Sequence, residues 1–263
     1  MLVRKMGPQD WTPERVTAFW DYWHQQDNAC SSYFSEQVGR GVVAYLRKCG
    51  VLRGDVLDYG CGNGALSAQL VREGVECWGC DGSAASIKVT NDTLAGKHGW
   101  QGAGLVNDPR APHRTRQFDL VTCLETIEHV TEQEEGKLFA DLWQTTKPGG
   151  IAFFTTPNEE DLTSADVNVY CPFCGASYHR MQHVRRFDAD SLAVTIEKYG
   201  FRVSRVEAVN FSRHQIPAWP GIWNVNARYF AGMVAGARFG PGRILYRRLG
   251  GRKPHLCAFA IKE

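Results

Sequence analysis

The sequence predicts an α/β protein whose doubly wound, mostly parallel sheet has seven strands, with helices on both faces. Short apolar segments typical of buried strands alternate with amphipathic segments of helical period along most of the chain. A glycine-rich turn directly follows the first apolar segment of this series. With 263 residues, 43% hydrophobic and 22% charged, the chain has the composition of a globular protein with a large core.

We divide the chain into an N-terminal helical cover, residues 1–50, and an α/β domain, residues 51–263. Two insertions interrupt the α/β domain: residues 157–187, which carry cysteines and histidines, and residues 212–253, which are rich in arginine, glycine and aromatic residues. The expected strands are residues 55–59, 76–80, 103–106, 118–124, 151–155, 201–211 and 256–261. The first expected helix of this domain ends near residue 70, and the other three span about residues 84–97, 130–146 and 188–199.

Charge is distributed unevenly along the chain. Nine Lys or Arg and no acidic residue lie between Arg213 and Lys262, whereas the preceding part is acidic. This segment is either a solvated basic face or a docking surface for an anionic or lipid-linked partner. An apolar stripe from Ile222 to Ala237 is compatible with packing on the sheet edge, a helix at a membrane surface, a wall of the acceptor pocket or a dimer contact. The oligomeric state stays open.

Nothing in the sequence indicates export or a membrane span. No run of 18 apolar residues exists, and the first residues lack the apolar region of a secretory signal. The nine cysteines are an odd number, which favours free thiols over a disulfide framework. We therefore expect a cytoplasmic protein, with peripheral contact to a membrane left open.

The strongest local motif is the turn that follows the first strand of the α/β domain. Its glycines allow a sharp turn and a close approach of the backbone to a ligand. Asp81 ends the next strand, where a carboxylate can accept hydrogen bonds from both hydroxyls of a ribose. The pattern also fits the dinucleotide fingerprint, so a nicotinamide cofactor is an alternative. Asp58 favours a ligand with a cationic amino-acid end, because an acid there would repel a pyrophosphate. The turn reads Asp58-Tyr59-Gly60-Cys61-Gly62-Asn63-Gly64.

With these motifs the sequence resembles the class I S-adenosylmethionine-dependent methyltransferases, which have a Rossmann-like fold. Further motifs in matching order are Asp108, Phe118-Asp119-Leu120-Val121 and Lys147-Pro148-Gly149-Gly150. The resemblance implies that Asp58 and the turn hold the methionine end of the cofactor, Asp81 binds the ribose, and Asp108 lies near the adenine amine. Leu124 and Glu125 would line the pocket under the methyl donor. The implied cofactor residues are Asp58, Gly60, Cys61, Gly62, Asn63, Gly64, Asp81, Gly82, Ser83, Asp108 and Leu124.

A cluster of acids and a histidine follows the fourth strand at the carboxyl edge of the sheet, where open α/β sheets bind ligands. Glu125, Glu128 and His129 are candidate catalytic residues, although acids also favour a helix start for structural reasons. The cluster resembles that of ubiquinone-biosynthesis O-methyltransferases and small-RNA 2′-O-methyltransferases. That resemblance implies that the three residues and His183 hold a divalent cation at the acceptor oxygen. We expect Glu128 and His129 to remove the acceptor proton, with Glu125 assisting.

The first insertion contains a second candidate metal site. Cys171, Cys174, His179 and His183 have the spacing C-x2-C-x4-H-x3-H, and thiolate and imidazole ligands suit a structural Zn²⁺. Such a loop would cover the acceptor pocket. Alternatives are two buried thiols beneath surface histidines, or a three-ligand zinc site with His183 turned toward Glu128.

We therefore expect methyl transfer to a hydroxyl of a small molecule or glycan. N-methylation of an amino sugar or natural product is the first alternative. Metal-dependent RNA 2′-O-methylation ranks lower, because the body of the chain is acidic and no basic-aromatic RNA motif is present, so a nucleic-acid partner is not expected. A zinc-stabilised scaffold that binds a partner without turnover is the non-enzymatic alternative.

Overall fold

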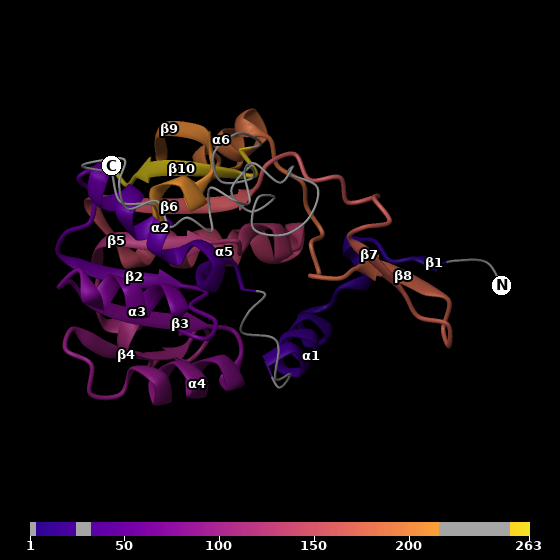
Figure 1. Cartoon of the computed structure of the whole chain (residues 1–263), viewed down its shortest axis with the longest axis horizontal. Helices are drawn as coiled ribbons and strands as arrows, with labels where there is room; N and C mark the ends of the chain where they lie inside the picture. Colours follow the sequence, from indigo (N-terminus) through magenta and orange to yellow (C-terminus); the bar gives the residue numbers. More distant parts are fainter. Residues whose placement is uncertain (1–3, 25–32, 216–252) are drawn as a thin grey trace, which may run out of the picture.

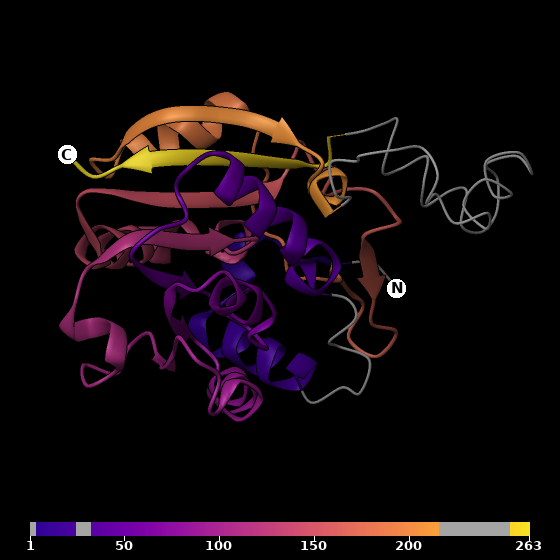
Figure 2. The same cartoon turned by 60° about the vertical axis from the view of Figure 1, so that its left-hand side comes forward.

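The computed structural model describes residues 4–24, 33–215 and 253–263 of the chain. A seven-stranded sheet with helices on both faces forms the main body, and a small three-stranded sheet projects from one side of it (Figures 1 and 2). This architecture confirms the predicted fold class. The described helices are α1 (Pro13–His24), α2 (Phe34–Lys48), α3 (Ala65–Arg72), α4 (Ala84–Leu94), α5 (Glu132–Thr145) and α6 (Ala189–Glu197). Short 3-10 turns are η1 (Pro8–Asp10), η3 (Pro112–Thr115), η4 (Ile127–His129) and η5 (Phe211–Gln215).

The main sheet has the strand order β4-β3-β2-β5-β6-β10-β9. Strand β10 runs antiparallel to both of its neighbours, and the other pairings of β2, β3, β4, β5 and β6 are parallel. The chain order reverses between β2 and β5, and open α/β sheets bind ligands at this point, beyond the carboxyl ends of the strands. The strands are β2 (Asp55–Tyr59), β3 (Glu76–Asp81), β4 (Trp100–Leu105), β5 (Phe118–Leu124), β6 (Thr146–Pro157), β9 (Arg202–Val209) and β10 (His255–Ile261).

Each face of the sheet has its own buried cluster. In β5, Val121 and Cys123 pack on the side of α5 and α6, whereas Leu120 and Leu124 pack on the side of α2 and α3. Successive side chains of a strand point to opposite faces. A central parallel strand must therefore be apolar at nearly every position, which is why this segment was easy to predict.

The boundaries of most elements agree with the sequence-based expectations. Strands β2 and β5 span the predicted residues, and α6 begins after Asp188, whose side chain forms a capping box with Ser191. The structure corrects β6, which begins at Thr146 rather than at residue 151. The motif Lys147-Pro148-Gly149-Gly150, which precedes the expected strand, is a bulge within β6. Gly149 has φ +75° there, and the pairing with β5 shifts register.

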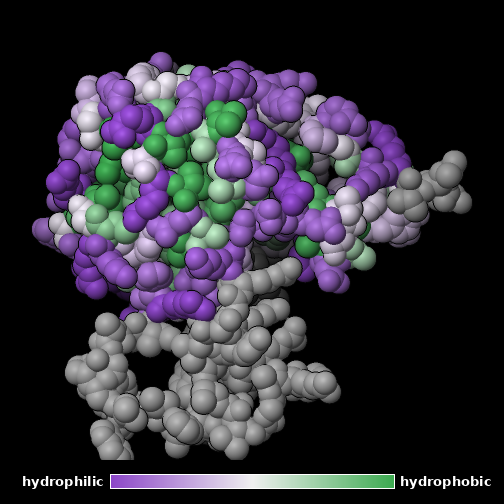
Figure 3. Space-filling view, turned by 90° about the horizontal axis from the view of Figure 1, so that it is seen from above, coloured by the Kyte–Doolittle hydropathy of each residue, from purple (hydrophilic) through white to green (hydrophobic). Residues whose placement is uncertain are grey.

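Strand β9 is one edge of the main sheet, next to α6. Val194 of α6 is 66% exposed, and Val203 and Val206 of β9 are half-buried. On the face seen from above, apolar side chains gather in a patch surrounded by hydrophilic ones (Figure 3). Among the described residues, no helix is long and apolar enough to cross a bilayer.

The small sheet was not predicted. Strands β7 (Asn168–Tyr170) and β8 (Ala176–His179) form an antiparallel hairpin within the first insertion, and β1 (Arg4–Lys5) adds in parallel to β8. The expected N-terminal cover thus separates into two parts: α2 packs on the main sheet beside α3 and η5, and α1 lies beside α4 (Figure 1). Most of the second insertion, including its predicted apolar stripe and Arg243, Arg247 and Arg248, lies outside the described residues.

Candidate active site

The glycine turn after β2 has a backbone that other residues adopt only with strain. Gly60, Gly62 and Gly64 have φ values of +77°, +54° and +80°. A Cβ on Gly60 would lie 2.6 Å from Oγ1 of Thr126, and one on Gly64 would lie 2.8 Å from Cγ2 of Thr90. The turn is therefore packed against its neighbours at the carboxyl edge of the sheet, as its sequence predicts.

Asp81, at the end of β3, is fixed beside this turn. Its carboxylate accepts hydrogen bonds from the backbone N–H groups of Gly62, at 3.0 Å, and Ser83, at 2.8 Å. The Ser83 side chain caps α4 and donates to Asp21 of α1 at 2.6 Å. The structure thus brings the predicted ribose acid and Gly82-Ser83 to the edge of the glycine turn.

Asp58 has a different environment from the expected one. Its side chain is only 2% exposed, and it accepts hydrogen bonds from the hydroxyls of Ser67, at 2.7 Å, and Thr122, at 3.1 Å. Burial raises the pKa of Asp58 to about 6, and the nearby charge of Asp81 adds to this effect. Its contacts join β2, α3 and β5 beneath the turn, so Asp58 holds the turn in this structure, while its expected role toward the methionine end of the cofactor stays a prediction.

The remaining predicted cofactor residues surround the same edge. Cys61 and Leu124 are buried, and Asn63 donates to Glu36 of α2 at 3.0 Å. Asp108 follows β4 on the surface, where hydrogen bonding from the backbone of Arg110 lowers the pKa of its carboxyl group. Glu36 was not predicted as a site residue, because in the sequence it is an ordinary acid in the first turn of a helix.

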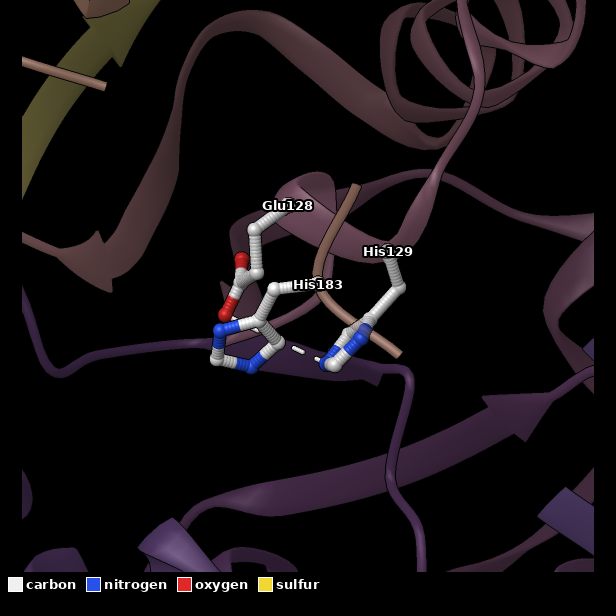
Figure 4. A group of neighbouring side chains, drawn as sticks. All are labelled: Glu128, His129 and His183. Atoms are coloured by element: carbon white, nitrogen blue, oxygen red, sulfur yellow. Dashed lines mark ion pairs between the residues drawn. The ribbon is translucent and has the colours of Figure 1, made fainter. Parts of the chain in front are cut away.

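One buried and two largely buried side chains meet at the other side of this edge. Glu128 and His129 belong to η4, and His183 comes from the end of the first insertion (Figure 4). One potential ligand atom of each lies within 4.8 Å of the others. We call these three residues the carboxylate–histidine trio. Glu125 is not a member: it has φ +44°, and its carboxylate accepts from Oγ1 of Thr155 at 2.8 Å.

The trio is built by contacts between η4 and the end of the insertion. The backbone N–H groups of Val184 and Arg185 both donate to the carbonyl oxygen of Glu128. The Gln182 side chain donates to the carbonyl oxygen of His129 at 2.9 Å and accepts from Nε1 of Trp20 at 3.1 Å. Trp20 also places its ring edge-on to the His129 ring, 4.9 Å between centroids, so α1 closes one side of the trio.

Burial favours the uncharged forms of two members of the trio, Glu128 and His129. Glu128 is 1% exposed, and burial together with the charge of Glu125 raises its pKa well above the ordinary value. Burial and the neighbouring His183 hold the pKa of His129 well below the ordinary value. Oε2 of Glu128 accepts from Thr156 at 3.2 Å, whereas Oε1 of Glu128 and Nδ1 of His129 have no hydrogen-bond partner among the described residues. Such orphaned atoms in a buried site are suited to a ligand.

The predicted zinc centre in the insertion is wrong as a four-residue site. Cys171 and Cys174 lie at the turn of the β7–β8 hairpin, whereas His179 lies at the opposite end of β8, paired with Asn168. The two histidines instead gather with Glu160. Cys174 is exposed, so the alternative of two buried thiols is also wrong. Backbone N–H groups of Cys174 and Phe173 lower the pKa of Cys171.

Glu160 is a site residue that the sequence did not reveal. Its carboxylate hydrogen-bonds to Nδ1 of His183, and its other oxygen lies 3.5 Å from Nε2 of His179. In the sequence it stands in a short acidic run with Glu159 and Asp161, and such runs are usually solvated. Only the fold shows that it contacts the trio.

Comparison with known proteins agrees with this fold and identifies the family of the chain. A family model described as "Methyltransferase domain" matches residues 22–206, and the chain therefore belongs to this family. It is 38% identical over 112 residues to the ubiquinone biosynthesis O-methyltransferase of Azoarcus sp. (strain BH72), covering 42% of this chain and 47% of that protein. The chain thus spans about half the length of the curated relatives it matches. Family membership favours the methyl-donor interpretation of the glycine turn over the nicotinamide alternative.

Solved structures show the same fold at low sequence identity. A SAM-dependent methyltransferase from Archaeoglobus fulgidus is 19% identical with a TM-score of 0.52, covering 92% of this chain and 100% of that chain. The DhpI–SAH complex is 16% identical with a TM-score of 0.56, covering 94% and 96%. At these identities the likeness concerns the fold alone.

Proposed function

We propose that this protein is an S-adenosylmethionine-dependent methyltransferase that transfers the methyl group to a hydroxyl of a small-molecule or glycan acceptor. The observation that carries the proposal is the carboxylate–histidine trio, which lies at the same sheet edge as the glycine turn and Asp81 and is largely shielded from solvent. The name of the Azoarcus relative, an O-methyltransferase of ubiquinone biosynthesis, favours oxygen as the accepting atom.

The reaction is a direct displacement. The acceptor oxygen forms a bond to the methyl carbon while the carbon–sulfur bond breaks, and the electron pair of that bond stays on sulfur as S-adenosylhomocysteine forms. The acceptor proton passes to His129, which is neutral because its pKa is low and so has a free lone pair. Alignment in a site closed by α1 and the insertion supplies much of the rate.

The trio also fits the divalent cation that the resemblance implies. One carboxylate oxygen and two imidazoles converge, and Oε1 of Glu128 is orphaned without a ligand. With an ion bound, Glu128, His129 and His183 would hold it, and it would lower the pKa of the acceptor hydroxyl. The lone pair of His129 would then be occupied, so the ion and the His129 base are alternative ways of removing the acceptor proton. We do not propose structural zinc at the four predicted Cys and His positions, because they do not meet.

The test is methyl transfer from isotopically labelled S-adenosylmethionine to a panel of phenols, sugars, amines and short RNAs, with and without added divalent cations. The proposal expects label on a hydroxyl together with one S-adenosylhomocysteine per methyl group transferred. Label on nitrogen only, or on RNA only, would favour one of the alternatives. Cofactor binding with no transfer across the panel would favour a binding scaffold.

A further inference from the structure

Glu160 lies between two imidazole rings next to the trio. Its Oε2 hydrogen-bonds to Nδ1 of His183, and its Oε1 lies 3.5 Å from Nε2 of His179. The two rings stack with their centroids 4.3 Å apart and their planes at 18°. All three side chains are largely buried, so the carboxylate is shielded from water on the side that faces the rings.

Backbone hydrogen bonds decide the protonation of His179. The N–H groups of Met181, at 3.3 Å, and His183, at 3.1 Å, both donate to its Nδ1. A nitrogen that accepts hydrogen bonds carries no proton, so the proton of the neutral ring is on Nε2, which faces Glu160. A metal ion on Nε2 would displace this proton. Nδ1 could not take it up without losing the two backbone hydrogen bonds that it accepts. The Nε2–H group of His179 thus points a partial positive charge at Oε1 of Glu160 across 3.5 Å, without a hydrogen bond between them among the described residues, and this arrangement disfavours His179 as a metal ligand.

The hydrogen bond with Glu160 also fixes which ring nitrogen of His183 carries the proton. An ionised carboxylate only accepts hydrogen bonds, so Nδ1 of His183 carries the proton shared with Glu160. The lone pair of the neutral ring is then on Nε2. His183 is also the member of the trio that comes from the insertion, so Glu160 sets the ring state of a residue at the reacting centre.

We propose that Glu160 is the positioning residue of the active site, holding His183 in one orientation and in the Nδ1–H tautomer, with His179 anchoring Glu160 from its other side. The inference deepens the proposed function and rests on it. A carboxylate that orients a functional histidine typically contributes about 10–100-fold to activity or to metal affinity. Glu160 comes from the insertion, so the insertion supplies both the histidine and the group that orients it.

Glu160→Gln gives a specific test, because the carboxylate presents an oxygen to each ring, whereas the amide of glutamine presents one oxygen and one N–H₂ group. His179 cannot release its Nε2 proton to Nδ1, since Nδ1 already accepts from the backbone. His183 must therefore face the amide N–H₂ group and move its proton to Nε2. Glu160→Asp keeps two acceptor oxygens and retains the Nδ1–H tautomer. Glu159→Gln is the matched control, because Glu159 is the exposed neighbour and loses the same charge.

The primary readout is the long-range ¹H–¹⁵N spectrum of protein labelled with ¹⁵N-histidine, which distinguishes the two tautomers without any turnover. We expect the Nδ1–H form of His183 in the wild type, Glu159→Gln and Glu160→Asp, and the Nε2–H form in Glu160→Gln. In the methyl-transfer assay we expect kcat of Glu160→Gln to fall about 10–100-fold, with KM for S-adenosylmethionine unchanged. Glu160→Asp should recover part of the loss.

A wild-type spectrum with His183 in the Nε2–H form would overturn the proposal even if Glu160→Gln fails to fold. An unchanged tautomer in a folded Glu160→Gln protein, or kcat within twofold of the wild type, would overturn it as well. The spectrum also separates this inference from the proposed function. If no acceptor is methylated but the tautomer switches as expected, the reaction assignment fails while the positioning of His183 stands.

Discussion

The backbone N–H of Val184 donates a 2.9 Å hydrogen bond to the carbonyl oxygen of Glu128. This contact joins the end of the first insertion to the 3-10 turn after β5, and it places His183 beside Glu128 and His129. The trio therefore forms only when the insertion docks on the sheet. Residues that dock it, such as Gln182, belong to the architecture of the site although they need not touch a substrate.

Asp81→Asn is expected to weaken the binding of S-adenosylhomocysteine about 10–100-fold, because one or two hydrogen bonds to a charged group are lost. Asparagine keeps the size of the side chain but removes the charge that ribose hydroxyls would face. Isothermal titration calorimetry measures the change. Asp92→Asn is the control, because Asp92 is exposed and forms an ion pair with the exposed Lys88, away from the glycine turn. Equal affinities of the Asp81 variant and the wild type would remove the ribose assignment.

His129→Ala should lower turnover at least about 100-fold, because a positioned general acid or base contributes at least about that much to the rate. Cofactor affinity should stay unchanged. His129 belongs to η4, at the far side of the edge from Asp81, so its loss removes the proton acceptor without touching the glycine turn. His98→Ala, at an exposed position, is the control. The assignment fails if the His129 variant turns over as fast as this control.

Gly60→Ala is expected to destabilise the protein more than Gly74→Ala. Both glycines have positive φ, +77° and +83°, so both changes carry backbone strain of about 1–2 kcal/mol. At Gly60 the new Cβ would lie 2.6 Å from Oγ1 of Thr126, whereas at Gly74 no atom of the described residues lies within 4 Å. Urea unfolding of both variants gives the difference. Equal losses of unfolding free energy in Gly60→Ala and Gly74→Ala would show that the turn relaxes away from Thr126.

His113 should make the stability of the protein depend on pH. It is fully buried, and burial followed by the charge of Arg114 lowers its pKa from 6.5 to about 4. The pKa of His113 is lower in the folded protein than in the unfolded chain. The contribution of neutral His113 to stability is therefore fully present above pH 6.5 and is lost as pH falls toward 4. His113→Phe removes this dependence.

The stability of His113→Phe relative to the wild type should therefore rise by up to about 3 kcal/mol between pH 6.5 and 4, measured by urea unfolding at each pH. The comparison must be between the two proteins. Asp58 has a raised pKa of about 6, so its own contribution is lost as pH rises from 3.8 and opposes that of His113. If the unfolding free energies of His113→Phe and the wild type changed in parallel with pH, the assignment to His113 would be contradicted.

The sheet and the glycine turn at its carboxyl edge were predictable because local rules govern them. A central parallel strand is buried on both faces, so β5 is apolar almost throughout. The positive φ angles of the glycine turn restrict its residue types, which makes the motif visible in the sequence. Asp81 follows from its place at the end of the next strand.

The insertion was not predictable because its contacts join residues that sequence spacing does not relate. The spacing of Cys171, Cys174 and His179 matches a zinc loop, but the intervening residues form a hairpin strand that carries the histidine away from the thiols. Glu160 reaches His183 only after the chain has passed through that hairpin. The contacts of Asp58 were missed because a motif defines a position in the chain and not the direction of a side chain.

The account is tested most directly by a crystal structure of the protein with bound S-adenosylhomocysteine. We predict that the ribose hydroxyls contact the carboxylate of Asp81 and that the sulfur atom faces Glu128, His129 and His183. Binding of the ligand away from the glycine turn, or with its sulfur turned from these three residues, would contradict the central claim that cofactor and acceptor meet there.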